Sequence, residues 1–139
     1  MIAKFATRIV LVYAAFGFLV SISMAVTPNL FLTITEFFRS PPGQYSSATL
    51  DLTMGAVFFA SAPDAKYPMG FKFISVILVL AGILYLILPI ESWAAYIDFW
   101  LADDLLLFRT LGAILGVVFC SFIIYAAIPR KRELNGNSI

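Results

Sequence analysis

Long apolar segments separated by short polar stretches are the main pattern along this chain of 139 residues. Three segments, residues 9–26, 71–88 and 105–128, carry almost no charge. Each has about the 20-residue length that a helix needs to cross a bilayer. Pro89 and Pro129 follow the second and third segments and end them. The pattern therefore predicts three transmembrane helices at these positions.

A fourth segment, residues 47–64, is weaker because its apolar part is short. Residues 52–62 cover only about 16 Å at a rise of about 1.5 Å per residue, against roughly 30 Å of hydrocarbon. To cross the bilayer, this helix must take Asp51 inside the outer boundary. A re-entrant or interfacial segment is the alternative. The distribution of charges favours a true crossing.

The basic residues fall on one side of the membrane if the chain crosses four times. Seven of the nine Lys and Arg residues would share that side: Lys4, Arg8, Lys66, Lys72, Arg130, Lys131 and Arg132. The other side would collect Glu36, Glu91, Asp98, Asp103 and Asp104, opposed by Arg39. Because Lys and Arg in short loops stay in the cytoplasm, we expect both termini to be cytoplasmic. Three crossings would instead translocate the basic tail.

The first segment has an alternative interpretation as a secretory signal. Lys4 and Arg8 precede the apolar run, and the small residues Ser23 and Ala25 lie near its end, where a cleavage site would be. The run is long for a signal peptide. We therefore expect an uncleaved helix and a multi-pass protein of the plasma (inner) membrane.

Two amphipathic stretches lie between the apolar segments, on the predicted outer side. Thr27-Pro28 is typical of a helix start. In residues 28–39 the apolar residues recur at helical spacing, so that they fall on one face of the helix and the polar residues fall on the other. The Ser-Pro-Pro-Gly sequence at 40–43 is expected to end that helix and turn the chain. In the second stretch, residues 91–103, one stripe contains Trp93, Tyr96 and Trp100, which we expect to anchor the helix at headgroup depth. A surface for a partner or a lipid is the alternative.

The composition agrees with an integral membrane protein and excludes several classes of function. Hydrophobic residues make up 62% of the chain and charged residues 12%, which is too apolar for a water-soluble domain of this length. There is no histidine, so histidine-ligated haem and the usual zinc sites are excluded. Cys120 is the single cysteine, and the net charge of +1 offers nothing to nucleic acid. We expect no cofactor, no metal site and no nucleic-acid partner.

Two ionisable residues are expected below the outer boundary of the membrane. Asp51 lies in the first turns of the segment 47–64, and Arg109 lies at the outer end of the segment 105–128. Equal depth makes an intramembrane ion pair possible, since pairing lowers the cost of a charge in lipid. The pair would then be a structural bridge, and Asp51→Asn would lower thermal stability. Alternatives are a gating or substrate-binding role, or Arg109 reaching other acidic residues near the boundary.

Small residues at a spacing of four recur in three of the predicted helices and suggest close helix packing. The residues are Gly112 and Gly116, Gly17 and Ser21, and Ala56 and Ala60. Packing within one bundle and association with another membrane subunit are both possible. Polar residues do not form a stripe along several helices, so a channel is not expected.

The order of segments resembles the small bacterial four-helix membrane proteins of the DoxX-like kind and similar uncharacterised families. The similarity rests on a first helix ending near Pro28, the amphipathic stretch that follows, and the sequence Leu50-Asp51-Leu52-Thr53-Met54-Gly55 at the entry to the second helix. These families mostly lack a defined activity. The resemblance therefore implies an architecture and no reaction.

Taken together, the pattern predicts an all-α integral membrane four-helix bundle, a single domain over residues 1–139, with two short outer interfacial helices. The expected function is that of a non-enzymatic accessory or structural subunit, which packs against other membrane subunits or self-associates in the lipid bilayer. The alternative is a small transporter or a lipid- or quinone-binding protein with an outward-facing cavity. A lipid-modifying enzyme ranks last, because no nucleophile–base pair is visible.

Overall fold

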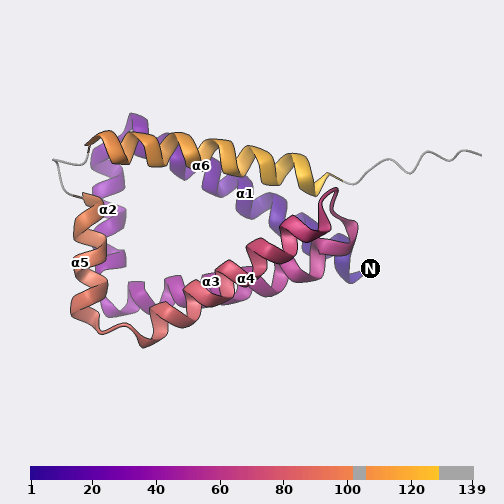
Figure 1. Ribbon diagram of the computed structural model, residues 1–139. Helices are drawn as coiled ribbons and strands as arrows, with labels where there is room; N and C mark the ends of the chain where they lie inside the picture. The colour runs from indigo at the N-terminus through magenta and orange to yellow at the C-terminus, as the bar shows by residue number, and fades with distance from the viewer. Residues whose placement is uncertain (102–105, 129–139) are drawn as a thin grey trace, which may run out of the picture.

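The computed structural model describes residues 1–101 and 106–128, and these are almost entirely helical (Figure 1). In chain order the elements are α1 (Ile2–Val26), α2 (Pro28–Arg39), α3 (Pro41–Ser61), the 3₁₀ turn η1 (Ala62–Asp64), α4 (Pro68–Ile87), α5 (Ile90–Leu101) and α6 (Leu106–Ala127). The described part contains no strand, which confirms the all-α prediction. The predicted distribution of charges also used the basic residues 130–132 and the acidic residues 103–104. These positions lie outside the described residues.

Three of these helices are long and apolar enough to cross a membrane: Ile2–Val26, Pro68–Ile87 and Arg109–Ala127. They correspond to the three strongly apolar segments of the sequence, which fits a membrane protein. The fourth long helix, α3, has 21 residues and is less apolar than the other three. Its weaker hydropathy comes from Gln44 and Asp51 together with the Ser and Thr residues within it.

The predicted turn at residues 40–43 is wrong in one respect, because Pro41 and Pro42 begin a helix. Ser40 is the N-cap of α3, and its side chain accepts a hydrogen bond from the backbone N–H of Gly43 at 3.4 Å. Proline suits the first turn of a helix, where its missing N–H has no partner to lose. As a result α3 starts six residues earlier than predicted from residue 47. It is therefore long enough to lie along all of α4.

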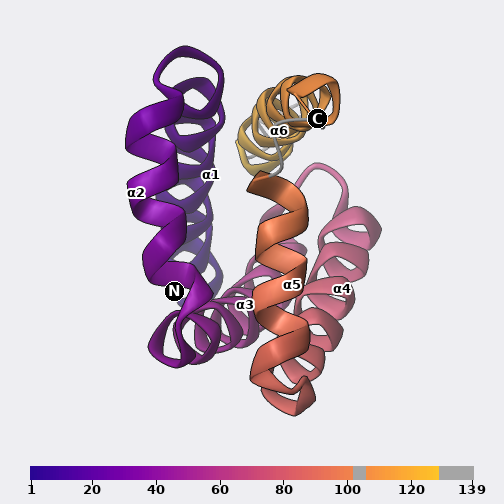
Figure 2. The ribbon, with the colours of Figure 1, turned by 90° about the vertical axis from the view of Figure 1, so that its left-hand side faces the viewer.

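The long helices form two antiparallel pairs, α1 with α6 and α3 with α4, joined by packing of α1 on α3. The two pairs converge at one end and diverge toward the other, where α2 and α5 run across the open end in contact with each other (Figures 1 and 2). The described helices thus form a V whose open end is spanned by α2 and α5. We call these two helices the brace. The buried core lies at the converging end and consists of Val10, Ala14, Met54, Phe58, Ala62, Phe71, Ile74, Ile123, Ala126 and Ala127. These helices therefore do not form a regular four-helix bundle, in which the core would extend along the full length of the helices.

Small residues set the close approach within each pair of helices. In the α3–α4 pair, a Cβ atom added to Gly82 would lie 2.7 Å from Cγ of Leu52 and 3.0 Å from the carbonyl oxygen of Ala48. Two turns further on, the hydroxyl of Ser75 donates a hydrogen bond of 2.7 Å to the carbonyl oxygen of Gly55. Glycine at these positions lets the two backbones come close enough for that bond.

The converging end is fixed by the segment that joins α3 to α4. The backbone N–H of Lys66 donates a 2.9 Å hydrogen bond to the carbonyl oxygen of Ala126 at the end of α6. The Lys66 ammonium lies 3.8 Å above the ring of Tyr125, and Tyr67 stacks on Phe122 with 6.0 Å between ring centres. These contacts tie one helix pair to the other at the narrow end.

The wide end is fixed by side chains of α2, α3 and α5. Nε1 of Trp93 donates a 2.6 Å hydrogen bond to the carbonyl oxygen of Phe38, and Arg39 forms a 2.9 Å ion pair with Asp98. The buried amide of Gln44 donates to the carbonyl oxygens of Tyr85 and Leu88, at 2.7 and 2.8 Å. Because the last carbonyls of a helix have no partner within it, Gln44 caps α4 and holds it against α3.

Replacing Gly82 by alanine tests the close approach of α3 and α4. We expect Gly82→Ala to lower the free energy of unfolding in detergent by about 1–3 kcal/mol, the usual cost of overpacking. The matched control is Gly70→Ala on the same helix, whose added Cβ would meet only Cβ of Tyr67, at 3.8 Å. This control gains helix propensity of up to about 1 kcal/mol. Equal melting temperatures for the two variants would contradict the packing described here.

Candidate functional site

Asp51 lies on the inner side of α3, the side that faces the space between the two helix pairs. It belongs to the same helical stripe as Met54 and Phe58 of the core, and its side chain is half-buried. It lies within electrostatic range of Tyr13 on α1 and Tyr85 on α4. The carboxylate of Asp51 thus interacts electrostatically with residues of two other helices of the V.

Arg109 is buried near the start of α6, but the structure does not join it to Asp51 by an ion pair. Among the described residues the ion pair is Arg39–Asp98 at the wide end, between two side chains that are about half exposed. Asp51 has neither an ion-pair partner nor a hydrogen-bond partner in the part of the chain that the structure describes. The structural bridge expected from the sequence is therefore not formed here.

An apolar cavity of about 240 Å³ lies between all four long helices, deeper in the V than Asp51. Its walls are formed by Tyr13, Phe58, Phe73, Ile74, Ile77, Leu78, Phe119 and Ile123. Tyr13 packs edge-on against Phe58, with 6.3 Å between ring centres. Tyr13 therefore lines the cavity and also lies within electrostatic range of Asp51, an arrangement that the sequence pattern did not reveal.

The predicted packing residues divide between two roles. Gly17 and Ser21 of α1 meet Cys120 and Gly116 of α6, since a Cβ atom added to Gly17 would lie 3.0 Å from Sγ of Cys120 and one added to Gly116 would meet the Ser21 side chain. Gly112 is half-buried, one turn along the same helix. Gly17, Ser21 and Gly116 thus pack α1 on α6 within the chain.

Ala56 and Ala60 do not take part in the α3–α4 contact. Ala56 is exposed and Ala60 is half-buried, while the close approach to α4 uses Ala48 and Gly55 instead. Gly55 and Gly82 could not be recognised as packing residues from the sequence, because neither has another small residue four positions away in its own helix. A small residue can be matched to its partner only once the two helices are placed together.

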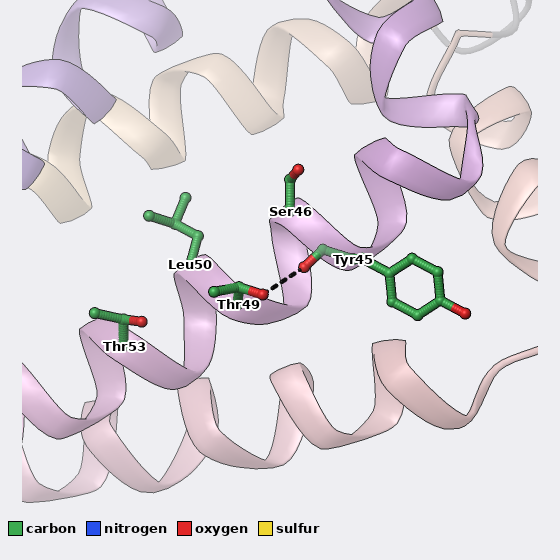
Figure 3. A pocket seen from close by; sticks show the side chains of 5 residues that line it. All are labelled: Tyr45, Ser46, Thr49, Leu50 and Thr53. Atoms are coloured by element: carbon green, nitrogen blue, oxygen red, sulfur yellow. Dashed lines mark hydrogen bonds between the residues drawn. The ribbon is translucent and has the colours of Figure 1, made fainter.

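The exposed face of α3 carries small and hydroxyl side chains in one continuous stripe. Its members follow one another at alternating spacings of three and four residues: Ser46, Thr49, Thr53, Ala56 and Ala60. Figure 3 shows the outer part of this stripe, where Tyr45, Ser46, Thr49, Leu50 and Thr53 line a shallow hollow. The hydroxyls of Thr49 and Ser46 donate to the carbonyl oxygens of Tyr45 and Pro42 in the same helix, at 2.8 and 2.7 Å. We call these five residues, from Ser46 to Ala60, the small-residue stripe.

The three aromatic residues expected as membrane anchors behave differently from one another. Trp93 is only 2% exposed and packs against Tyr85, with 4.9 Å between ring centres, so it is a core residue of the wide end. Tyr96 is 43% exposed and lies 5.7 Å from the Trp93 ring. The Trp100 side chain lies outside the described residues. Burial of Trp93 follows from the brace, which turns its side chain inward toward α2 and α4.

Within the described residues no group of three or more His, Cys, Asp and Glu side chains comes together to hold a metal ion. No family model, no curated protein and no solved structure matches this chain. The resemblance to DoxX-like proteins therefore stays a prediction from the sequence.

The unpaired state of Asp51 reverses the expectation for its substitution. A half-buried carboxylate without a partner costs folding free energy, because burial removes water from the charge. We expect Asp51→Asn to raise the melting temperature in detergent by a few degrees. Asp64→Asn, which removes the same charge near the narrow end, is the control and should leave melting unchanged. A fall in the melting temperature of the Asp51 variant would show that the carboxylate has a stabilising cation partner.

Proposed function

We propose that this chain is a four-crossing, non-enzymatic subunit of the plasma (inner) membrane that binds another membrane-embedded helix through the small-residue stripe of α3. The observation that carries the proposal is the exposure of Ser46, Thr49, Thr53 and Ala56 along this stripe, where small and hydroxyl side chains face away from the other helices. An associated helix covers that surface and removes it from lipid. The chain then acts as an accessory subunit of a larger assembly or of a homo-oligomer.

A fourth crossing by α3 is supported by its packing on α4. The two helices lie antiparallel in close contact, and the 21 residues of α3 extend about 32 Å at about 1.5 Å per residue. A helix that accompanies α4 over this length spans the same depth of the bilayer. Neighbouring helices cover polar groups of α3 and keep them away from lipid. A crossing is therefore compatible with the low hydropathy of this helix.

The distribution of charges supports cytoplasmic termini. Lys4 and Arg8 begin α1 at the narrow end, and Lys66 and Lys72 lie at that same end, between α3 and the first turn of α4. The acidic residues Glu36, Glu91 and Asp98 belong to α2 and α5, which lie at the wide end. By the positive-inside rule the narrow end faces the cytoplasm.

The stripe differs from the exposed faces of the other long helices. Those faces present large side chains suited to lipid, such as Leu19 on α1, Leu80 on α4 and Leu115 on α6, all more than half exposed. Along the stripe, Thr and Ala side chains instead let a second backbone approach closely, which favours helix–helix contact in a membrane. Each interhelical hydrogen bond from a hydroxyl adds on the order of 0.6 kcal/mol.

Disulfide cross-linking in native membranes tests the proposal. In a Cys120→Ala background, which removes the single cysteine, Ala56→Cys places a thiol at the middle of the stripe. We expect oxidation to convert most of this variant into a cross-linked species. A species of twice the chain mass identifies a second copy of the chain, and one of another mass identifies a different subunit, to be named by mass spectrometry.

Val76→Cys in the same background is the matched control. Val76 is 55% exposed on α4 and lies at the depth of Ala56, because Gly55 packs beside Ser75 and Val79. We expect it to stay uncross-linked. If the Ala56 variant remains monomeric under conditions that cross-link an established membrane dimer, or if Val76→Cys cross-links equally well, the stripe is not an interface.

A further inference from the structure

The inner side of the V carries a second feature, independent of the stripe on the opposite face of α3. From the wide end inward, the first layer is an aromatic cluster in which Tyr85 contacts Trp93 and Tyr96, with ring centres 4.9 and 6.5 Å apart. Asp51 comes next. It lies within electrostatic range of Tyr85 on the side of the wide end and of Tyr13 on the side of the core. The apolar cavity lies beyond Tyr13.

The carboxylate of Asp51 has no partner among the described residues, although its side chain is half-buried. Charged groups on transmembrane segments are costly, and those that face the interior of a bundle mark binding sites or transport pathways. A carboxylate in a partly apolar site binds a cation better than one in water, because fewer water molecules compete for it. The chemistry of this position therefore favours a positively charged group.

The aromatic rings near Asp51 favour the same kind of group. Tyrosine faces attract cations through their negative quadrupole, and the attraction grows when water is excluded. Tyr13 of α1 and Tyr85 of α4 both lie within electrostatic range of Asp51. A carboxylate with phenol rings within electrostatic range is suited to an ammonium group, including a methylated one that donates few or no hydrogen bonds.

The cavity below Tyr13 favours an apolar tail on the same molecule. Its volume of about 240 Å³ exceeds the roughly 150 Å³ of an apolar cavity that takes up a benzene molecule, and lies just under the usual range for drug-sized ligands. Apart from the Tyr13 phenol its walls are hydrocarbon or aromatic side chains. A short alkyl chain or a single ring fits this space.

The cavity is accessible from the side, between α4 and α6. These two helices are not among the closely packed pairs of the V. Phe73 and Ile77 of α4 and Phe119 of α6 line the cavity and are also exposed on the outside, at 68%, 48% and 49%. A molecule dissolved in the bilayer can therefore enter between α4 and α6 without passing through water.

From these observations we infer that the interior of the V binds an amphiphilic cation, with its ammonium group at Asp51 on the inner side of α3 and its alkyl chain in the cavity beside Tyr13, Phe58 and Ile123. The ligand class is a lipid-soluble amine or quaternary ammonium compound. Binding depends on the charge of the head group as well as on the apolar tail. Association through the small-residue stripe is neither required for this binding nor prevented by it.

Binding of three matched amphiphiles to the full chain in neutral-lipid nanodiscs tests the inference. The probes are decyltrimethylammonium, decanol and decyl sulfate, and protein-free nanodiscs give the background partitioning into lipid. We expect saturable binding of decyltrimethylammonium at one molecule per chain, about tenfold or more tighter than decanol. Decyl sulfate should show no saturable binding, because Asp51 repels it.

Three variants separate the contribution of the charge from that of the cavity. Asp51→Asn should weaken decyltrimethylammonium binding about tenfold or more while leaving decanol binding unchanged, and Asp51→Glu should restore part of the cation affinity. Ile123→Trp fills the cavity and should weaken both probes. Asp64→Asn, which removes a carboxylate at the narrow end, should change neither.

The results also separate this inference from the proposed association. Equal affinity for the cation and for decanol, or a cation affinity that Asp51→Asn does not change, would overturn the inference whatever the cross-linking shows. Absence of saturable binding of any probe to the folded chain, with helicity and melting intact, would overturn it as well. Failure of the Ala56 cross-link would leave the binding measurements unaffected.

Discussion

The divergence of the two helix pairs is the constraint on which the rest of this structure depends. At the narrow end, the segment between α3 and α4 binds the end of α6 through Lys66 and Tyr67. At the wide end, α2 and α5 contact each other and keep the pairs apart. The main hydrophobic core lies where the pairs converge, and beside it an apolar cavity remains between the four long helices.

The hydrogen bonds at the wide end explain why the pairs do not collapse onto one another. Trp93 of α5 bonds to the last turn of α2, and Gln44 of α3 bonds to the last carbonyls of α4. Both side chains are buried, so losing either bond would leave carbonyl oxygens without a partner in an apolar surrounding. The brace is therefore held by polar contacts, which lipid strengthens because it supplies no competing water.

Hydropathy and helix-start residues were enough to predict the elements of this chain, because these signals are local. Three apolar segments appear as α1, α4 and α6, and Thr27-Pro28 begins α2 at the residue expected. The Pro41-Pro42 start of α3 was missed, since the same residues also serve turns. The inward position of Trp93 and the absence of an Asp51–Arg109 pair could not be predicted, because both depend on how far the helix pairs diverge. The matching of Gly116 with Ser21 required the relative placement of two helices for the same reason.

The low hydropathy of α3 follows from polar residues on two opposite faces. Asp51 and Gln44 lie on its inner side, whereas Thr49 and Thr53 lie on the side away from the other helices. A helix that only filled a space in the membrane would need neither set, and apolar residues at these positions would make its insertion more favourable. Gln44 is explained by its cap on α4, but Asp51 and the two threonines satisfy no need of the folded chain that the structure reveals. Groups that cost insertion energy and contribute nothing to folding are the ones expected to contact other molecules. On this argument we assign both the proposed ligand-binding carboxylate and the proposed interface to α3, the least apolar of the four long helices.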